Sequence, residues 1–270
     1  MRLLILTLSA IAGMIIASGS NLLASEMAIP KDAQDYWNKG QLNLEKGNPK
    51  LAAQDFRKAL EIFHNFAKAH YSMAVACLAL GNDVLASVHL KCYLDLEPEN
   101  VVARQNYADL LLRMEQVDKA KEQFELFLKE AQKFGPEAQK LMVHTHSRLM
   151  SIAQMEGDEY SEHLHRGIGM YYLGLEKERN PDEFKEGDHK PEAILIRAAA
   201  ELTQARMLRS DQVKSCWYLY LVWDKLCCSQ PANRWLKLVS QEASLNQLTP
   251  REYEAFHLAS RERETQFPRK

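Results

Sequence analysis

The chain repeats itself every 34 residues between positions 33 and 134, and this periodicity limits its fold more than any other feature. Gly47 and Gly81 lie one period apart, and an asparagine follows each of them. When glycine is 11 of 270 residues, a glycine match at one fixed offset arises by chance roughly once in 25 trials. Three further positions recur in the same register: Ala52, Ala86 and Ala120, then Phe56, Leu90 and Phe124, then Ala59, Tyr93 and Phe127. This pattern indicates a stack of similar units, each of which buries its apolar face against its neighbours.

Composition indicates that these units are helical. Gly and Pro number 11 and 9 of 270 residues, which is about 7% of the chain against about 12% in average usage. Such scarcity argues against a turn-rich β-sandwich, a collagen-like chain or a disordered tract. The formal net charge is −2. No overall positive field therefore attracts polyanions, and we expect no nucleic-acid partner.

The period resembles that of the tetratricopeptide repeat, a pair of antiparallel helices that stacks into a superhelix. In the family's small-residue position, where two helices approach closely, the chain has Gly40, Ala74 and Ala108. Two positions depart from the family's pattern. The family's terminal proline is present in the second repeat as Pro98, but His64 and Gln132 take its place in the first and third repeats. In the third repeat Glu115 replaces the glycine of the turn. The resemblance implies an all-α fold, a right-handed superhelical solenoid of antiparallel helix hairpins, with three repeats at 33–66, 67–100 and 101–134.

Beyond residue 134 the resemblance becomes loose. Residues 135–178 predict a divergent helical hairpin, whose second helix is unusual in containing three glycines, Gly167, Gly169 and Gly174. The charged, proline-bounded segment 179–191 predicts an exposed loop. Residues 192–263 predict a helix, a last repeat shifted out of phase, and a capping helix that begins with a capping box at 249–252.

Residues 1–25 predict export. Arg2 is the only charged residue before Glu26, and small residues follow the apolar run from Leu3 to Ile16. This pattern is typical of a secretory signal peptide, but the stretch to Ala24 is also about long enough for an uncleaved membrane anchor. We expect the protein to be periplasmic or extracellular. Its only expected contact with the membrane is through an uncleaved N-terminal segment.

The concave positions of the expected solenoid provide the candidate binding residues. The Lys and Asn pattern with which some members of the family clamp a C-terminal carboxylate is absent. We expect a mixed groove, aromatic and amide at its start and more polar in its middle, that holds a peptide or helix. For Trp217 and its aromatic neighbours the alternative is burial in a bulky core. The predicted groove residues are Trp37, Gln41, Tyr71, Gln105, Asp109, Arg113, Trp217, Tyr218 and Asp224.

The sequence contains no recognisable catalytic or cofactor-binding motif. His144 and His146 are two residues apart, as are His163 and His165, so neither pair can chelate a metal from one helix face. One histidine from each helix could still meet across the hairpin. We expect no metal and no cofactor, and we expect the five cysteines to be free thiols.

These features predict an exported scaffold or adaptor that binds a protein or peptide along its concave groove and has no catalytic activity of its own. The alternative is a helical ligand-binding protein or enzyme that uses residues 135–191, whose glycines and histidines the repeat does not explain. A third reading is a structural envelope protein that associates with itself. A closed apolar pocket with converging polar groups would favour the second class, and an open groove the first.

Overall fold

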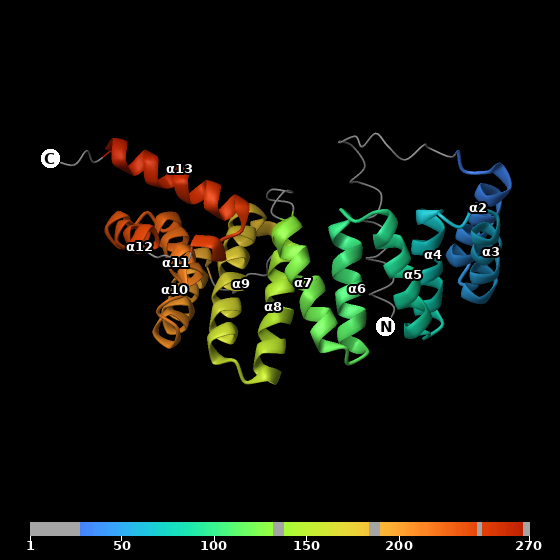
Figure 1. Cartoon of the computed structure of the whole chain (residues 1–270), viewed down its shortest axis with the longest axis horizontal. Helices are drawn as coiled ribbons and strands as arrows, with labels where there is room; N and C mark the ends of the chain where they lie inside the picture. Colours follow the sequence, from blue (N-terminus) through green and yellow to red (C-terminus); the bar gives the residue numbers. More distant parts are fainter. Residues whose placement is uncertain (1–27, 132–137, 184–189, 242–244, 267–270) are drawn as a thin grey trace. The chain divides into compact units, whose positions relative to one another are not determined.

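The computed structural model describes residues 28–131, 138–183, 190–241 and 245–266 (Figure 1). The predicted leader falls in residues 1–27, outside the described residues. Every regular element in the described ranges is a helix, which confirms the all-α fold. The chain divides into two compact units, Met1–Ala103 (unit 1) and Arg104–Lys270 (unit 2).

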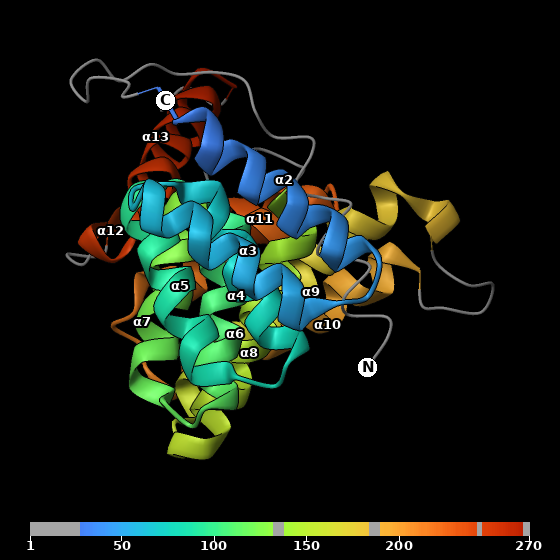
Figure 2. The same cartoon turned by 90° about the vertical axis from the view of Figure 1, so that its right-hand side faces the viewer.

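Unit 1 contains two helix hairpins and the start of a third. In the first, α2 (Lys31–Glu45) packs against α3 (Pro49–Ile62), and in the second α4 (Ala67–Ala79) packs against α5 (Asp83–Leu96). The two hairpins meet through α3 and α4. The boundary between the units falls within α6 (Val101–Arg113). Figure 2 shows the helices of unit 1 from the side of α2 and α3.

The first half of unit 2 continues the hairpin pattern and then adds a single helix. After α6 come α7 (Val117–Ala131), α8 (Gln139–Glu156) and α9 (Glu159–Arg179). A 3-10 helix at Pro181–Glu183 follows, and then α10 (Pro191–Leu208), which packs along α9. The exposed loop expected at 179–191 is therefore shorter than predicted, because α9 and α10 each include one end of it. Residues 184–189 of that segment lie outside the described residues.

The second half of unit 2 is one more hairpin followed by a last helix. α11 (Val213–Lys225) packs against α12 (Ser229–Gln241), and a 3-10 helix at Leu245–Gln247 precedes α13 (Pro250–Gln266). Buried apolar residues from α9 to α13 form one continuous cluster. This part of the chain therefore has a shared core in which α13 takes part.

Five helix hairpins in the described ranges share one turn. A residue one or two positions after the first helix has a left-handed backbone, with φ between 57° and 74°. The N–H of the following residue donates to a carbonyl five residues earlier, at 2.8 to 3.0 Å, which is the Schellman pattern of a helix C-terminus. Glu115, where the family has glycine, adopts the same conformation at a steric cost. The left-handed residues are Gly47, Gly81, Glu115, Gly157 and Cys227.

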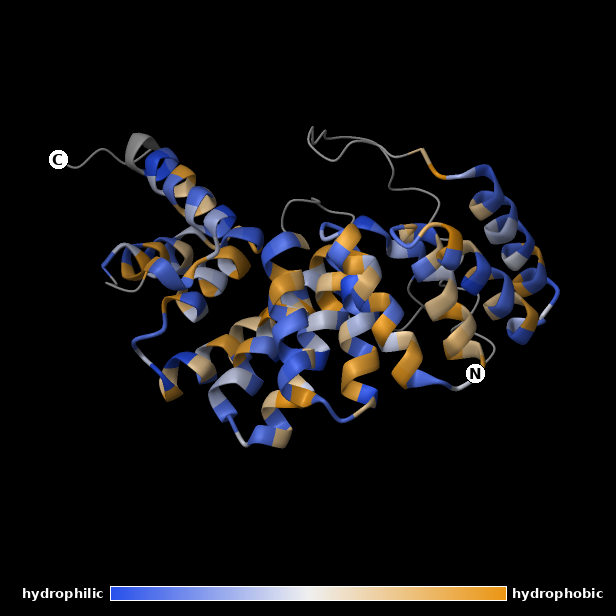
Figure 3. Cartoon of the chain, turned by 45° about the vertical axis from the view of Figure 1, so that its right-hand side comes forward, coloured by the Kyte–Doolittle hydropathy of each residue, from blue (hydrophilic) through white to orange (hydrophobic). Residues whose placement is uncertain are grey.

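The periodic small residues lie where helices touch. A Cβ atom on Gly40 of α2 would lie only 2.4 Å from Cε1 of Phe56 in α3. Ala74 and Ala108, at the same position in α4 and α6, are fully buried. The period therefore records the close contacts between helices. Figure 3 shows hydrophilic and hydrophobic residues mixed along the helices, with hydrophilic residues at several of the turns between them. The alanines of the second helix are fully buried as well: Ala52, Ala86 and Ala120.

The three glycines of α9 have a packing explanation. A Cβ atom on Gly167 would lie 2.6 Å from Cγ of Leu202 in α10, and one on Gly174 would lie 2.9 Å from another leucine of α10. Gly169 faces α8, and a Cβ atom on Gly169 would lie 3.3 Å from the Cβ of His146. The glycines therefore let α9 approach the helices on both sides of it. They are the feature of residues 135–191 that the repeat pattern leaves unexplained.

The predicted capping box begins α13. The Thr249 N–H donates to Glu252 Oε2 at 2.8 Å, and the Glu252 N–H donates to Thr249 Oγ1 at 3.4 Å. Each side chain thus satisfies a backbone donor at the helix start, and Pro250 takes the first helical position. This prediction is confirmed.

Candidate functional site

The predicted groove residues of unit 1 lie on α2 and α4. Trp37 is half-buried: its indole N–H donates to Ser72 Oγ at 3.0 Å, and its ring centre lies 6.0 Å from that of Phe66. Ser72 lies on α4, so this hydrogen bond joins α2 to α4. Tyr71 and Gln41 are also half-buried. Unit 1 thus presents two partly accessible aromatic rings and an amide on neighbouring helices.

Gln105 of α6 does not belong to an accessible groove, and its prediction as a binding residue is wrong. The side chain is buried. Its amide donates to the backbone oxygen of Leu141 at 2.9 Å and to Thr145 Oγ1 at 2.8 Å, both in α8. Because both amide hydrogens are used in this contact, Gln105 holds α6 against α8 and has no donor left for a partner.

The other two predicted residues of α6 are more accessible. Asp109 is half-buried and accepts hydrogen bonds from two side chains of α8, Arg148 Nε at 2.9 Å and His144 Nε2 at 2.8 Å. Arg113, one helical turn further on, is exposed. Asp109 is therefore a carboxylate already paired within the protein, and Arg113 is an exposed charged side chain of the same helix.

Two of the three predicted residues on α11 are in the core, and the alternative reading of these aromatic residues is correct. Trp217 and Tyr218 are each only 2% exposed. Phe256 of α13 meets the Trp217 ring edge-on at 6.3 Å, and the Tyr218 hydroxyl donates to Glu252 Oε1 at 2.8 Å. Asp224 is exposed and forms an ion pair with Arg263 Nη2 at 2.5 Å. The helix α13 thus covers the side of α11 that was expected to face a ligand.

Two imidazole pairs bridge the helices of their hairpins. His146 Nδ1 lies 3.0 Å from His165 Nδ1, so one histidine from each helix does meet across the hairpin. His70 and His89 form an equivalent pair at 3.0 Å. The sequence reasoning missed that second pair, although both pairs share a spacing of 19 residues that could have revealed it. His70 Nε2 donates to the backbone oxygen of His64 at 2.9 Å, so His70 Nδ1 accepts the hydrogen bond from His89.

Burial keeps these pairs neutral. It lowers the pKa of His89 to about 4, with a further contribution from His70. It lowers the pKa of His165 to about 3, and the charges of Lys214 and Lys121 act in the same direction. The pKa of His146 is also well below its ordinary value, first through burial and then through His165. In the described ranges no three His, Cys, Asp or Glu side chains gather as metal ligands.

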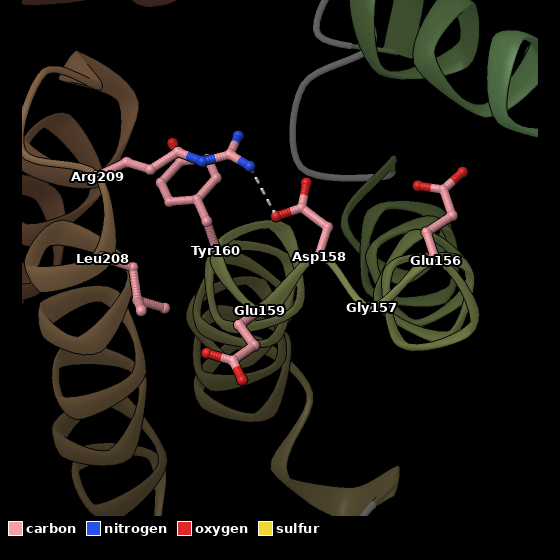
Figure 4. A pocket seen from close by; sticks show the side chains of 7 residues that line it. All are labelled: Glu156, Gly157, Asp158, Glu159, Tyr160, Leu208 and Arg209. Atoms are coloured by element: carbon pink, nitrogen blue, oxygen red, sulfur yellow. Dashed lines mark hydrogen bonds and ion pairs between the residues drawn. The ribbon is translucent and has the colours of Figure 1, made fainter.

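An open pocket lies at the turn between α8 and α9, beside the end of α10 (Figure 4). Arg209 donates to Asp158 Oδ1 at 3.1 Å and lies 4.8 Å from the centre of the Tyr160 ring. Asp158 also accepts the Ser161 N–H at 3.2 Å and so caps α9. Burial raises the pKa of Asp158, but the hydrogen bonds from Ser161 and the charge of Arg209 outweigh it, and the net shift is downward. These polar groups pair with each other, so capping of the turn accounts for them. The lining residues are Glu156, Gly157, Asp158, Glu159, Tyr160, Leu208 and Arg209.

The remaining candidates for chemistry are accounted for within the chain. His163 of α9 donates to Glu201 Oε2 of α10 at 2.6 Å. All five cysteines lie in the described ranges as free thiols; Cys77 and Cys216 are buried, and Cys227 is exposed. None of the helices that the structure describes has the length and apolar character needed to cross a membrane.

Family models and solved structures were compared with the chain. Tetratricopeptide repeat models match residues 35–63 and 84–144. No curated protein sequence matches. Similar solved structures include MamA from Desulfovibrio magneticus RS-1, with 18% identity, coverage of 79% of this chain and 96% of the other, and a TM-score of 0.35. PilF of Pseudomonas aeruginosa has 16% identity, covers 89% and 94%, and has a TM-score of 0.34. YrrB, a TPR protein described as having an unusual peptide-binding site, has 15% identity, covers 77% and 84%, and has a TM-score of 0.36.

The two model matches include the first helices of unit 1 and the α5–α7 region, where the repeat period is also strongest. The same turn recurs in five helix hairpins of the described ranges. Repeats of this kind generally form scaffolds for protein interactions. The chain contains tetratricopeptide repeats, at residues 35–63 and 84–144.

Proposed function

We propose that this protein is an exported scaffold that binds a protein or peptide partner through the surface of α2 and α4 in unit 1, and that it has no catalytic activity. The observation that carries the proposal is the Trp37–Ser72 hydrogen bond. It fixes Trp37 against α4, the helix that also carries Tyr71, while both rings remain partly accessible. Partly exposed aromatic rings are favoured anchors of protein interfaces.

The chemistry of this surface suits an extended peptide or a helix. The two rings offer apolar contact area with little conformational entropy to lose. Gln41 on α2, also half-buried, adds an amide that can both donate to and accept from a peptide backbone. The ring of Tyr71 is supported from behind by Tyr93, 5.2 Å away between centres, and that of Trp37 by Phe66. Such supported rings keep their orientation before a partner arrives.

A pull-down from the source organism with the full chain tests the proposal. We expect the double variant Trp37→Ala/Tyr71→Ala to lose the partner that the wild type captures. The matched control is Tyr36→Ala, because Tyr36 is a half-buried aromatic residue on the same helix that faces Lys58 of α3 instead, with 5.3 Å from the ammonium to the ring centre. Retention of every partner by a folded double variant would show that this surface is not the binding site.

The export part of the proposal is supported by the leader-like pattern of residues 1–25. Fusion of residues 1–30 to a reporter that folds only outside the cytoplasm is expected to give an active reporter, and Leu6→Arg in the apolar run is expected to abolish that activity. A reporter that stays inactive with the intact leader contradicts export. The size of the mature chain then distinguishes a cleaved signal peptide from an anchor.

A ligand-binding or catalytic role for residues 135–191 loses its original motivation. The three glycines of α9 serve helix packing. The histidines of this region pair with Asp109, with Glu201 and with each other. This supports the non-catalytic reading, and an interaction scaffold remains the function that the accessible residues favour.

A further inference from the structure

The same pair of imidazole rings joins the two helices of one hairpin in each unit. His70 of α4 lies eleven residues before the left-handed residue of its hairpin, and His89 of α5 lies eight residues after it. His146 and His165 stand at the same two positions of the α8–α9 hairpin. In both pairs the Nδ1 atoms are 3.0 Å apart, and the ring centres are 5.3 and 5.2 Å apart. The imidazole pair is therefore a recurring bridge at one place of the hairpin.

The pair in unit 1 has room for one proton between its facing nitrogens. His70 Nε2 donates to the backbone oxygen of His64 at 2.9 Å, so His70 Nδ1 is the acceptor and His89 Nδ1 the donor of the bridge. A second proton would set two N–H groups against each other across 3.0 Å. It would also place a charge beside or on the ring of His70, which is only 3% exposed. A protonated pair therefore cannot keep the contact that joins α4 to α5.

The side chains around the pair add to this effect. His64, in the connection after α3, has its ring edge-on to that of His70, with 5.7 Å between centres. Burial lowers the pKa of His70, the hydrogen bond to the His64 carbonyl acts against it, and the charge of the His64 ring lowers the pKa further. Burial also lowers the pKa of His89 to about 4, with a contribution from His70. Uncharged side chains pack on the first turns of α4 as well: Trp37 of α2, Phe63 at the end of α3 and Tyr93 of α5.

The residues that follow His70 on α4 belong to the proposed binding surface. Tyr71 comes next, and Ser72 accepts the indole N–H of Trp37 at 3.0 Å. The ring of Tyr71 rests on Tyr93 of α5, on the other side of the imidazole pair, with 5.2 Å between centres. A separation of α4 from α5 therefore removes the support of Tyr71 and moves the acceptor that fixes Trp37.

We propose that the His70–His89 pair is an acid-sensitive latch on the binding surface of unit 1: protonation of the pair separates α4 from α5 and lowers the affinity of the surface for its partner. This inference rests on the proposed function and adds the regulation of the same site. His89 binds a proton with a pKa of about 4 in the closed hairpin and about 6.5 in an open one. The open form therefore gains stability relative to the closed form as the pH falls below about 6.5.

Hydrogen exchange on the full chain at about pH 7.5 and about pH 5, corrected for the intrinsic effect of pH on exchange, measures the opening. His89 alone is expected to raise the population of the open α4–α5 hairpin about thirtyfold at the lower pH, because its pKa changes from about 4 to about 6.5 on opening. The double variant His70→Gln/His89→Gln keeps polar side chains but does not titrate, and we expect it to lose this response. The matched control is His146→Gln/His165→Gln, which removes the equivalent pair of unit 2. We expect α4 and α5 of the control to respond to acid as in the wild type.

An equal acid response of α4 and α5 in the wild type and in His70→Gln/His89→Gln would overturn the latch. If that variant does not fold, the wild type gives the answer by NMR. The indole N–H resonance of Trp37, identified by its loss in Trp37→Phe, is expected to shift between about pH 7.5 and about pH 5 as its contact with Ser72 changes. A resonance that stays in place would be contrary to the proposal.

The pull-down at the same two pH values separates this inference from the function on which it rests. We expect the wild type to release its partner at about pH 5 and His70→Gln/His89→Gln to retain it. A partner that the wild type captures at neutral pH and keeps in acid contradicts the latch alone. Capture at neutral pH that survives Trp37→Ala/Tyr71→Ala contradicts the surface itself, and the exchange measurement still reports on the pair because it needs no partner.

Discussion

Acidification is expected to destabilise unit 2 through the His146–His165 pair. Burial lowers the pKa of His165 in the folded protein to about 3, and the positive charges of Lys214 and Lys121 lower it further, with Asp158 acting in the opposite direction. Burial, His165 and Lys214 lower the pKa of His146 as well. Below about pH 6.5, the ordinary pKa of histidine, these two side chains are protonated in the unfolded chain. In the native protein they remain neutral there. The free energy of unfolding must fall as the pH falls through this window, and it must be insensitive to the pair above it.

The size of the effect follows from the shift. At about pH 5 the unfolded His165 is about 1.5 pH units below its pKa and almost fully protonated, while the folded one remains neutral. At about 1.4 kcal/mol per pH unit, His165 alone costs about 2 kcal/mol of stability at that pH relative to neutral solution. His146 contributes in the same direction. A loss of this size is a large share of the net stability of a domain.

Denaturant unfolding at about pH 7.5 and about pH 5 measures the loss. Tryptophan fluorescence suits this assay, because three of the four tryptophans, Trp217, Trp223 and Trp235, lie in unit 2. The double variant His146→Gln/His165→Gln keeps polar side chains of similar size but does not titrate. Its own cost at neutral pH cancels when the two pH values are compared, as does the contribution of the His70–His89 pair. We expect the variant to lose at least about 2 kcal/mol less than the wild type on acidification. Equal losses in the two chains would refute the depressed pKa values.

Three further predictions concern the helix contacts and ends. Glu115→Gly is expected to raise stability by about 1 kcal/mol in thermal unfolding, because it relieves a left-handed backbone at φ 59°, and Gly81→Ala to lower it by a similar amount; a stabilising Gly81→Ala would disprove the reasoning. Gly167→Ala is expected to lower the free energy of unfolding by about 1–3 kcal/mol, because the new Cβ would lie 2.6 Å from a carbon of Leu202. Gly169→Ala is expected to lower it less, because the nearest contact there is at 3.3 Å. The reverse order in denaturant titrations would count against close packing of α9 and α10. Thr249→Ala is expected to cost about 1 kcal/mol by removing the cap of α13, and unchanged protection of the first turn in hydrogen exchange would contradict it.

The local part of the fold was predictable because its causes are local. A period of 34 residues with small residues at fixed places indicates hairpins, since helices approach closely only where side chains are small. The capping box at Thr249 was equally readable, because both partners lie within one turn of the chain. Glu115 was less so. Its left-handed backbone follows from the same Schellman hydrogen bond that the glycines make, and that bond is a property of the hairpin rather than of one residue type.

The accessibility of the candidate site could not be predicted in the same way. Trp37, Tyr71, Gln105 and Trp217 all lie ten residues before the left-handed turn of their hairpins, so the register assigns them one direction. Which helix comes to lie in front of that direction depends on residues far along the chain. For Gln105 it is α8, through Leu141 and Thr145, and for Trp217 it is α13, through Phe256. Sequence register thus identifies candidate contact positions but does not tell whether the chain itself occupies them.

This difference changes how the repeat positions bear on function. Trp37 and Trp217 are equivalent residues, one half-buried with its indole N–H satisfied by Ser72, the other covered by a helix of the same chain with its N–H unsatisfied. The contact made by α13 is therefore an example, within this protein, of how a helix is held at that position: an aromatic ring against the tryptophan and a carboxylate on the tyrosine hydroxyl beside it. In unit 1 the same position meets α4, where Ser72 accepts the indole N–H of Trp37. The register thus turns this position toward the next first helix in each unit, and the accessibility of the ring depends on how far that helix covers it.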